Sequence, residues 1–108
     1  MKKIFLLLFI SSGLYSQNIF TVDYPYQSDL KVFVVDYEYK SDLKVFRVKN
    51  SYQAKGNEGL WYFVDQEYKS DKKIIFVDYE YQSDLKVFFV DQQYQAGWEN
   101  NSKKHLLY

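Results

Sequence analysis

The chain has no cysteine among its 108 residues, and it has only one histidine, one proline and four glycines. Without thiols, disulfide cross-links, thiolate zinc sites and cysteine nucleophiles are excluded, and a single histidine leaves little room for a histidine-based triad. The 14 Lys and Arg side chains are matched by 14 Asp and Glu side chains, so no basic field exists to attract nucleic acid or an anionic membrane. What the sequence does have is 47% apolar and 21% aromatic residues, which is ample material for the core of one small domain.

The first residues differ in character from the rest of the chain. Lys2 and Lys3 precede an unbroken apolar run over residues 4–10, and small residues follow that run. A basic start, a short apolar segment and small residues are typical of a secretory signal peptide. We therefore predict that residues 1–16 are a signal peptide and that residues 17–108 are one exported domain, either periplasmic or secreted.

The apolar run is too short to cross a membrane, because a hydrocarbon core requires about 20 apolar residues. Cleavage fits after Gly13 or after Ser16, and the pattern does not choose between them. Once Lys2 and Lys3 are removed, acidic side chains outnumber basic ones by two. An exported chain without cysteine must be stabilised by packing and not by disulfide bonds.

The rest of the chain is a tandem repeat whose copies each start at a valine, with intervals of 13, 13, 16, 13 and 13 residues. The longer interval contains a three-residue insertion near residues 56–59, and residues 100–108 lie outside the repeat. One copy buries too little apolar surface to offset its ordering entropy, so the copies must fold together. The starting valines are Val22, Val35, Val48, Val64, Val77 and Val90.

Each copy contains one apolar stretch that is rich in β-branched and aromatic residues, such as residues 30–35, and it predicts a strand. Alternation places Leu30, Val32 and Val34 on one face and Phe33 on the other. Both faces are mainly apolar, so we expect both to be covered. The equivalents of Phe33 are Phe46, Tyr62, Ile75 and Phe88, and those of Val32 are Val45, Trp61, Ile74 and Val87.

The connectors between the strands carry one tyrosine at the same place in every copy. A six-residue connector spans about 20 Å when extended, so parallel strands require a tight arrangement and antiparallel strands are easier to connect. The pattern does not decide between the two arrangements. We expect the connector tyrosines to close the core with their rings while their hydroxyls reach water or carbonyl groups. They are Tyr26, Tyr39, Tyr52, Tyr68, Tyr81 and Tyr94.

Three phrases in the chain carry a family resemblance: VDYEYQSDLKVFFVDQQYQAGW at residues 77–98, GLWYFVD at residues 59–65 and SKKHLLY at residues 102–108. Together they resemble a family of bacterial septoil knot domains. The third copy departs from the pattern, because Lys49 and Asn50 replace Asp-Tyr. The resemblance implies a mainly β fold with a deeply knotted backbone, whereas composition and spacing alone indicate only an all-β single domain. It implies no activity.

Two features suggest chemistry, and for both we favour a structural explanation. Aspartates recur six residues apart, but the carboxylates are sparse, and a calcium site needs six to eight oxygens from a dense loop. Residues copied in every unit are more simply explained as turn caps than as a catalytic pair. His105 has no second ligand near it in the tail. We predict no catalytic residue, no metal site and no cofactor. The aspartate pairs are Asp23 with Asp29, Asp36 with Asp42, Asp65 with Asp71, and Asp78 with Asp84.

The sequence therefore favours a non-enzymatic structural or interaction domain with an unknown partner. The alternative is a glycan- or protein-binding module that exposes its tyrosines and tryptophans in one row. Core packing is the preferred interpretation of Trp61, which lies in a predicted strand, whereas Trp98 fits either role. Tyrosine-rich strands with open edges also leave a homo-oligomer open.

Overall fold

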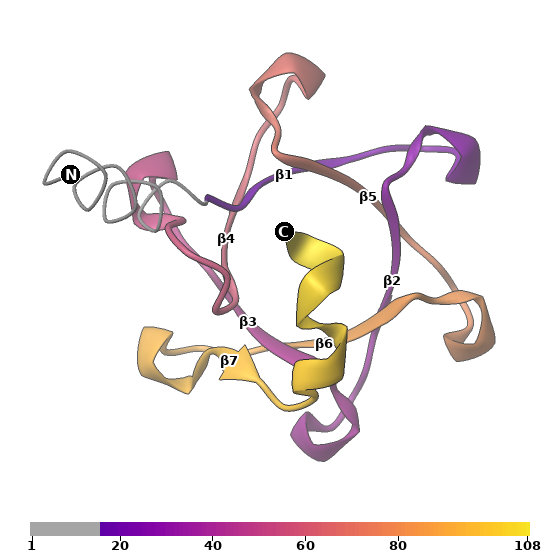
Figure 1. Ribbon diagram of the computed structural model, residues 1–108, viewed down its shortest axis with the longest axis vertical. Helices are drawn as coiled ribbons and strands as arrows, with labels where there is room; N and C mark the ends of the chain where they lie inside the picture. The colour runs from indigo at the N-terminus through magenta and orange to yellow at the C-terminus, as the bar shows by residue number, and fades with distance from the viewer. Residues whose placement is uncertain (1–15) are drawn as a thin grey trace, which may run out of the picture.

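The computed structural model describes residues 16–108, which form a ring of strands with connectors that project outward (Figure 1). Except for residue 16, the predicted signal peptide lies outside the described residues. The strands are β1 (Asn18–Thr21), β2 (Leu30–Val34), β3 (Leu43–Arg47), β4 (Leu60–Phe63), β5 (Lys72–Phe76), β6 (Leu85–Phe89) and β7 (Gly97–Trp98). Short 3-10 helices alternate with them: η1 (Pro25–Gln27), η2 (Glu38–Lys40), η3 (Ser51–Gln53), η4 (Glu67–Lys69), η5 (Glu80–Gln82), η6 (Gln93–Gln95) and η7 (Asn101–Leu107).

Within residues 16–108, six parallel strands close into a barrel in the order β4-β1-β5-β2-β6-β3, and β3 pairs with β4 to complete the ring. The short β7 pairs antiparallel with β3. The predicted all-β single domain of tandem strand-plus-connector copies is confirmed. The parallel arrangement, which the sequence left open, is the one that the chain adopts.

The strand order shows how such short connectors join parallel strands. After β1, the chain passes over one position in the ring to form β2 and then β3, and β5 and β6 later fill the positions that were passed over. The backbone thus travels twice around the barrel axis, and in Figure 1 each strand continues around the ring from the previous one. A connector therefore turns a corner at the rim and does not have to return to the start of its own strand.

The barrel interior is filled by one face of each strand. A central layer of six side chains, one from each barrel strand, is completely buried. Three leucines lie above this layer, at the starts of β2, β3 and β6. The central side chains are Ile19, Val32, Val45, Trp61, Ile74 and Val87.

The expectation that both strand faces are covered is met only in part for the outer face. Val35 and Val48 are buried there, whereas Phe33 and its equivalents are only half-buried. A single closed ring has one interior, so the second apolar face has only the flanks of the connectors to pack against. The half-buried equivalents are Phe46, Tyr62, Ile75 and Phe88.

The second aspartate of each pair joins strands from the two rounds of the chain. The backbone N–H of Asp42 donates to the carbonyl of Lys86 at 2.7 Å, and Asp42 Oδ2 accepts from the backbone N–H of Lys86 at 2.9 Å. As predicted, these aspartates accept backbone N–H bonds, but their partners lie in another copy and not in their own turn. The same clamp joins Asp29 to Lys73, Asp71 to Asn18, and Asp84 to Lys31.

We predict that Asp42→Ala lowers the free energy of unfolding by about 2 to 3 kcal/mol, because it leaves the backbone N–H of Lys86 without its charged acceptor. Asp42 is 4% exposed and also accepts from Asn100 Nδ2 at 3.2 Å, so little water can replace the carboxylate. Urea unfolding followed by circular dichroism measures the change. Asp36→Ala is the matched control, because Asp36 is exposed, and it should change stability by less than about 0.5 kcal/mol. Equal losses in the two variants would contradict the clamp.

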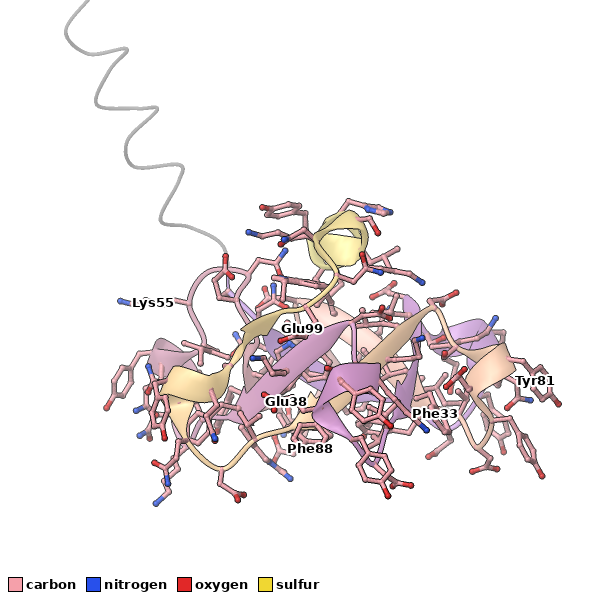
Figure 2. The ribbon with its side chains drawn as sticks, turned by 90° about the horizontal axis from the view of Figure 1, so that it is seen from below. Phe33, Glu38, Lys55, Tyr81, Phe88 and Glu99 are labelled. Atoms are coloured by element: carbon pink, nitrogen blue, oxygen red, sulfur yellow. The ribbon has the colours of Figure 1, made fainter. Side chains whose placement is uncertain are left out.

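One end of the barrel is closed by η7, which lies within the ring in Figure 1 and above it in Figure 2. Leu107 is buried in the core cluster, and its carbonyl accepts a hydrogen bond from Gln17 Nε2 at 3.0 Å. Lys103 Nζ donates to the carbonyl of Asp84 at 2.8 Å. These contacts place η7 over the end at which the strands begin. None of the helices in the described part of the chain is long and apolar enough to span a membrane.

Candidate functional site

The connector tyrosines are the most exposed large hydrophobic side chains of the described residues, so the expectation that they close the core is wrong. The exposed fraction of the six equivalent side chains runs from 70% for Tyr52 to 84% for Tyr94. Each is the central residue of a 3-10 turn at the rim, and strand side chains together with η7 already fill the interior. Figure 2 shows Tyr81 at the outer tip of its connector. We refer to each connector with its 3-10 turn as a lobe, and we name it by that turn.

Three of the six lobes carry two tyrosines whose rings stack on each other. Their ring centroids lie 5.7 to 5.8 Å apart, and their planes differ by 17 to 25°. In the other three lobes the first ring is replaced by Asn50, Gln66 or Gln92. The stacked pairs are Tyr24 with Tyr26 in lobe η1, Tyr37 with Tyr39 in lobe η2, and Tyr79 with Tyr81 in lobe η5.

The three paired lobes are neighbours in space although they are not consecutive in sequence. They follow strands β1, β5 and β2, which are adjacent in the ring. Figure 1 accordingly shows η1, η5 and η2 side by side around one half of the rim, while η6, η3 and η4 occupy the other half. We call the six rings of η1, η5 and η2 the tyrosine arc. The two-round path of the chain creates the arc, because it places the fifth lobe between the first and second.

Carboxylates accompany the tyrosine arc. Asp23, Asp36, Asp78 and Glu80 are exposed in its three lobes, and Lys40 is the one basic residue of these turns. The fifth acidic side chain, Glu38, lies 3.4 Å from Lys44 Nζ. The arc is therefore both aromatic and acidic.

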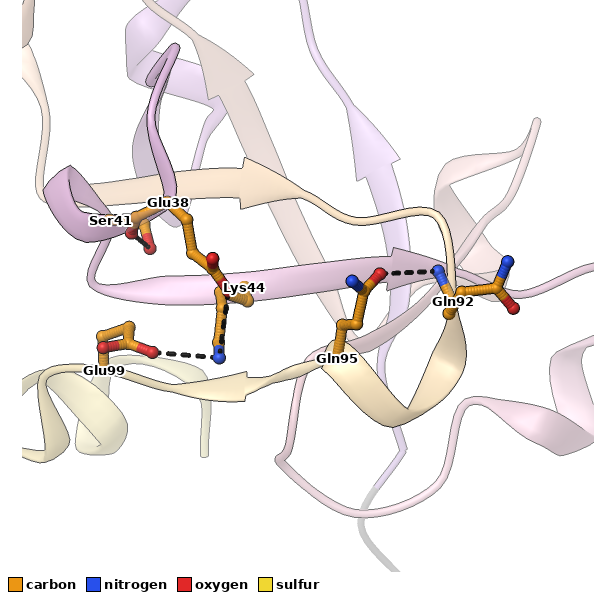
Figure 3. Close-up of polar contacts among 6 residues, drawn as sticks. All are labelled: Glu38, Ser41, Lys44, Gln92, Gln95 and Glu99. Carbon is orange, nitrogen blue, oxygen red and sulfur yellow. Dashed lines mark hydrogen bonds and ion pairs between the residues drawn. The ribbon is translucent and has the colours of Figure 1, made fainter.

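Lys44 ties lobe η2 to the segment that precedes η7 (Figure 3). Its Nζ lies 3.0 Å from Glu99 Oε1 and 3.4 Å from Glu38 Oε1. The hydrogen bond to Glu99, aided by the one to Glu38, raises the pKa of the Lys44 ammonium above its ordinary value. Other lobe contacts are local: Ser41 Oγ donates to the carbonyl of Glu38, and the backbone N–H of Gln92 donates to the side chain of Gln95.

Tyrosines of the rim already bind ammonium groups of this chain. Lys40 Nζ lies 5.4 Å from the centre of the Tyr37 ring, and Lys69 Nζ lies 5.8 Å from that of Tyr68. Lobes η1 and η5 have Gln27 and Gln82 where Lys40 stands in η2. The rings of these two neighbouring lobes therefore have no lysine of their own lobe at that position.

A second candidate site lies at the end of the barrel opposite η7. There the last inward-facing residues of the strands line an open hollow of about 490 Å³. Phe63 and Phe89 pack against each other with ring centroids 6.5 Å apart, and Phe76 is 40% exposed. The guanidinium carbon of Arg47 lies 4.6 Å from the centre of the Phe63 ring. We call this hollow the barrel mouth; its lining residues are Thr21, Arg47, Phe63, Val64, Asp65, Phe76 and Phe89.

The structure places most of the side chains that drew attention in the sequence in structural roles. Trp61 is buried in the core, and Trp98 is half-buried with its Nε1 donating to the carbonyl of Asn57 at 2.7 Å. His105 lies exposed in η7. Within residues 16–108, no group of three or more acidic or histidine side chains is arranged to hold a metal ion. The predicted row of exposed aromatics therefore consists of tyrosines and includes neither tryptophan.

Sequence reasoning missed Arg47. Its signal was present, because Arg47 is the one charged side chain at a repeat position that otherwise holds Thr21, Val34, Phe63, Phe76 and Phe89. A unique charged residue at such a position is where a repeat protein can build a specific site.

Comparison with known families gave one match. The description of that family is 7(1) septoil knot domain, and it matches residues 16–99. Searches of curated proteins and of solved structures found no significant match.

Proposed function

This chain belongs to the septoil knot domain family, and from that premise we propose that it is an exported, non-enzymatic binding protein whose tyrosine arc recognises a basic segment of a partner protein. The single observation that carries the proposal is the gathering of three exposed, stacked tyrosine pairs on one half of the rim. Solvent-exposed aromatic clusters of this size mark interaction surfaces.

The composition of the lobes supports a protein partner. Tyrosine offers a large, rigid contact area that loses little side-chain entropy on binding, and serine and glutamine add adaptable hydrogen bonds, as in antibody loops. The stacked pairs hold each other in place, so the arc is partly ordered before a partner arrives. The clamp carboxylates at the ends of these lobes are engaged by backbone N–H groups, which supports a structural role for them.

Charge favours a basic partner. A lysine or arginine side chain over a tyrosine ring gains about 0.5 to 2 kcal/mol from cation–π attraction. Lys40 already makes this contact with Tyr37, whereas η1 and η5 leave their rings to an external cation. Asp23, Asp78 and Glu80 in the same lobes add ionic attraction that speeds association.

A glycan is the competing ligand. Stacking uses one face of each tyrosine, so a sugar ring has only the outer faces of each pair available. The flanking carboxylates can accept hydrogen bonds from the hydroxyls of a neutral sugar, but only a cationic segment also gains Coulomb attraction from them. The balance of these contacts favours the basic protein segment.

The proposal predicts that a decalysine peptide binds the protein saturably and that replacing Tyr24, Tyr26, Tyr79 and Tyr81 together with serine weakens binding at least tenfold. The rings are exposed, so this variant should retain its fold, which circular dichroism checks. Fluorescence anisotropy of the labelled peptide measures binding at two salt concentrations.

The control replaces Tyr52 and Tyr94 with serine, because these rings are also exposed but lie on the other half of the rim. It should change binding less than twofold. Equal losses in both variants would show non-specific attraction to an acidic protein and contradict the proposal. Saturable binding of neutral oligosaccharides that depends on the same four tyrosines would also contradict it, in favour of a glycan ligand.

A further inference from the structure

The barrel mouth is a hollow lined by three phenylalanine rings, and it carries one cation, Arg47, and one carboxylate, Asp65. Mouths of β-barrels are frequent ligand sites, because the barrel supplies a rigid wall and the end of the interior supplies apolar contact area. Here the opposite end is closed by η7, which leaves a single way into the interior. The floor of the mouth is the fully buried central layer, including Trp61 and Ile74, so the hollow is shallow.

Arg47 is the side chain that gives the mouth its chemistry. Alternation places it on the same face as Val45, whose exposed fraction is zero, so its stem points toward the barrel axis. Its guanidinium group lies over the Phe63 ring. None of the ion pairs among residues 16–108 includes Arg47. A guanidinium held by an aromatic ring keeps its N–H edges directed to the side, where they can donate two parallel hydrogen bonds to a carboxylate.

We propose that the barrel mouth binds a small aromatic monocarboxylate, with the carboxylate on the guanidinium of Arg47 and the ring among Phe63, Phe76 and Phe89. Two of these rings already meet at a tilted angle of 41°, and a third flat ring extends such packing. The shallow floor excludes a long hydrocarbon chain. Asp65 at the edge of the hollow repels a second negative charge, which disfavours a dicarboxylate.

This site is independent of the tyrosine arc. The mouth is lined by the ends of the strands inside the ring, whereas the arc lies at the tips of the lobes. Either proposal can therefore fail while the other stands.

The experiment compares trans-cinnamate with cinnamyl alcohol, which has the same ring and no charge. We expect cinnamate to bind saturably with one site per chain and to shift the amide resonances of β3 to β6 near the mouth in a nitrogen–proton correlation spectrum. Arg47→Val, which installs the residue found at the equivalent position 34, should weaken cinnamate binding at least tenfold and leave alcohol binding within twofold. Arg47→Lys should fall between these values, because it keeps the charge and loses the bidentate fork.

Lys49→Ala is the matched control, since it removes one positive charge close to Arg47 from a residue that does not line the mouth. It should leave both affinities within twofold. Three results would overturn the inference: no saturable cinnamate binding, equal weakening by Lys49→Ala and Arg47→Val, or equal affinity for cinnamate and its alcohol. Sedimentation velocity showing a dimer that Phe76→Ser dissolves would also overturn it, because a second copy would then occupy the mouth.

Discussion

Gly59→Ala is expected to lower the free energy of unfolding by about 2 to 5 kcal/mol. Gly59 adopts φ of +90°, which costs an L-residue about 1 to 2 kcal/mol. A Cβ at this position would also collide with the backbone carbonyl oxygen of Lys44, which belongs to β3 and cannot rotate away. Relieving such an overlap costs about 1 to 3 kcal/mol more.

The position of Gly59 explains why its substitution should destabilise the whole barrel. Its carbonyl accepts from the backbone N–H of Phe46 at 2.8 Å, and the next residue starts β4. The pairing of β3 with β4 is the one that closes the ring, so a displaced Gly59 opens the barrel.

Gly56→Ala is the control for this prediction. Gly56 lies in the same insertion with φ of +75°, but nothing surrounds an added Cβ there. It should therefore lose only the conformational part, about 1 to 2 kcal/mol. Urea unfolding of both variants separates the two contributions, and equal losses would show that the contact with Lys44 is unimportant.

Trp61→Ala is expected to be as damaging, with a loss of about 3 to 5 kcal/mol. Trp61 is the largest fully buried side chain, and it contacts Phe63 edge-on with ring centroids 6.0 Å apart. Small domains have about 5 to 15 kcal/mol of stability in total, so this variant should be partly unfolded at room temperature.

Trp61→Phe distinguishes lost volume from lost polarity. The Nε1 group of Trp61 is buried without a hydrogen-bond partner in the described structure, so removing it gives up no bond. The phenylalanine variant should lose less than half of what the alanine variant loses. Losses of similar size would indicate that the indole N–H is satisfied in solution. Tyr81→Ala removes an exposed ring and should change stability by less than about 0.5 kcal/mol.

The sequence predicted the strands and their inner faces correctly, but it predicted the burial of the outer face and of the connector tyrosines less well. Alternation identified the strands and correctly placed Val32 with Leu30, because period-two patterning is a property of each strand alone. It could not tell that Phe33 would be only half-buried, since coverage of the outer face depends on how many layers the whole fold has. The prediction that the connector tyrosines are buried failed for a related reason. The sequence shows that these rings are apolar, but it does not show that side chains of the strands and of η7 already fill the interior.

For the candidate sites too, the sequence identified individual residues but not their arrangement in space. The tandem spacing identified the connector tyrosines. Their gathering into an arc depends on the order in which strands from the two rounds alternate in the ring, and no local sequence pattern encodes that order. The sequence showed that Arg47 departs from the repeat. Only the structure shows that Arg47 lies at the end of the barrel that η7 does not cover, where it can contact a ligand. The clamp aspartates were assigned to the right kind of hydrogen bond with the wrong partner, because the partner is 44 residues away from Asp42 in sequence.

The interleaved strand order also governs how the protein can be made. Strands β1, β2 and β3 form no ladder with one another, and each acquires neighbours only from β4 onward. During synthesis, β1, β2 and β3 therefore stay without their ladder partners until β4 and the later strands have been made. The barrel cannot begin to close before the chain has been synthesised as far as Leu60, which lies past its midpoint.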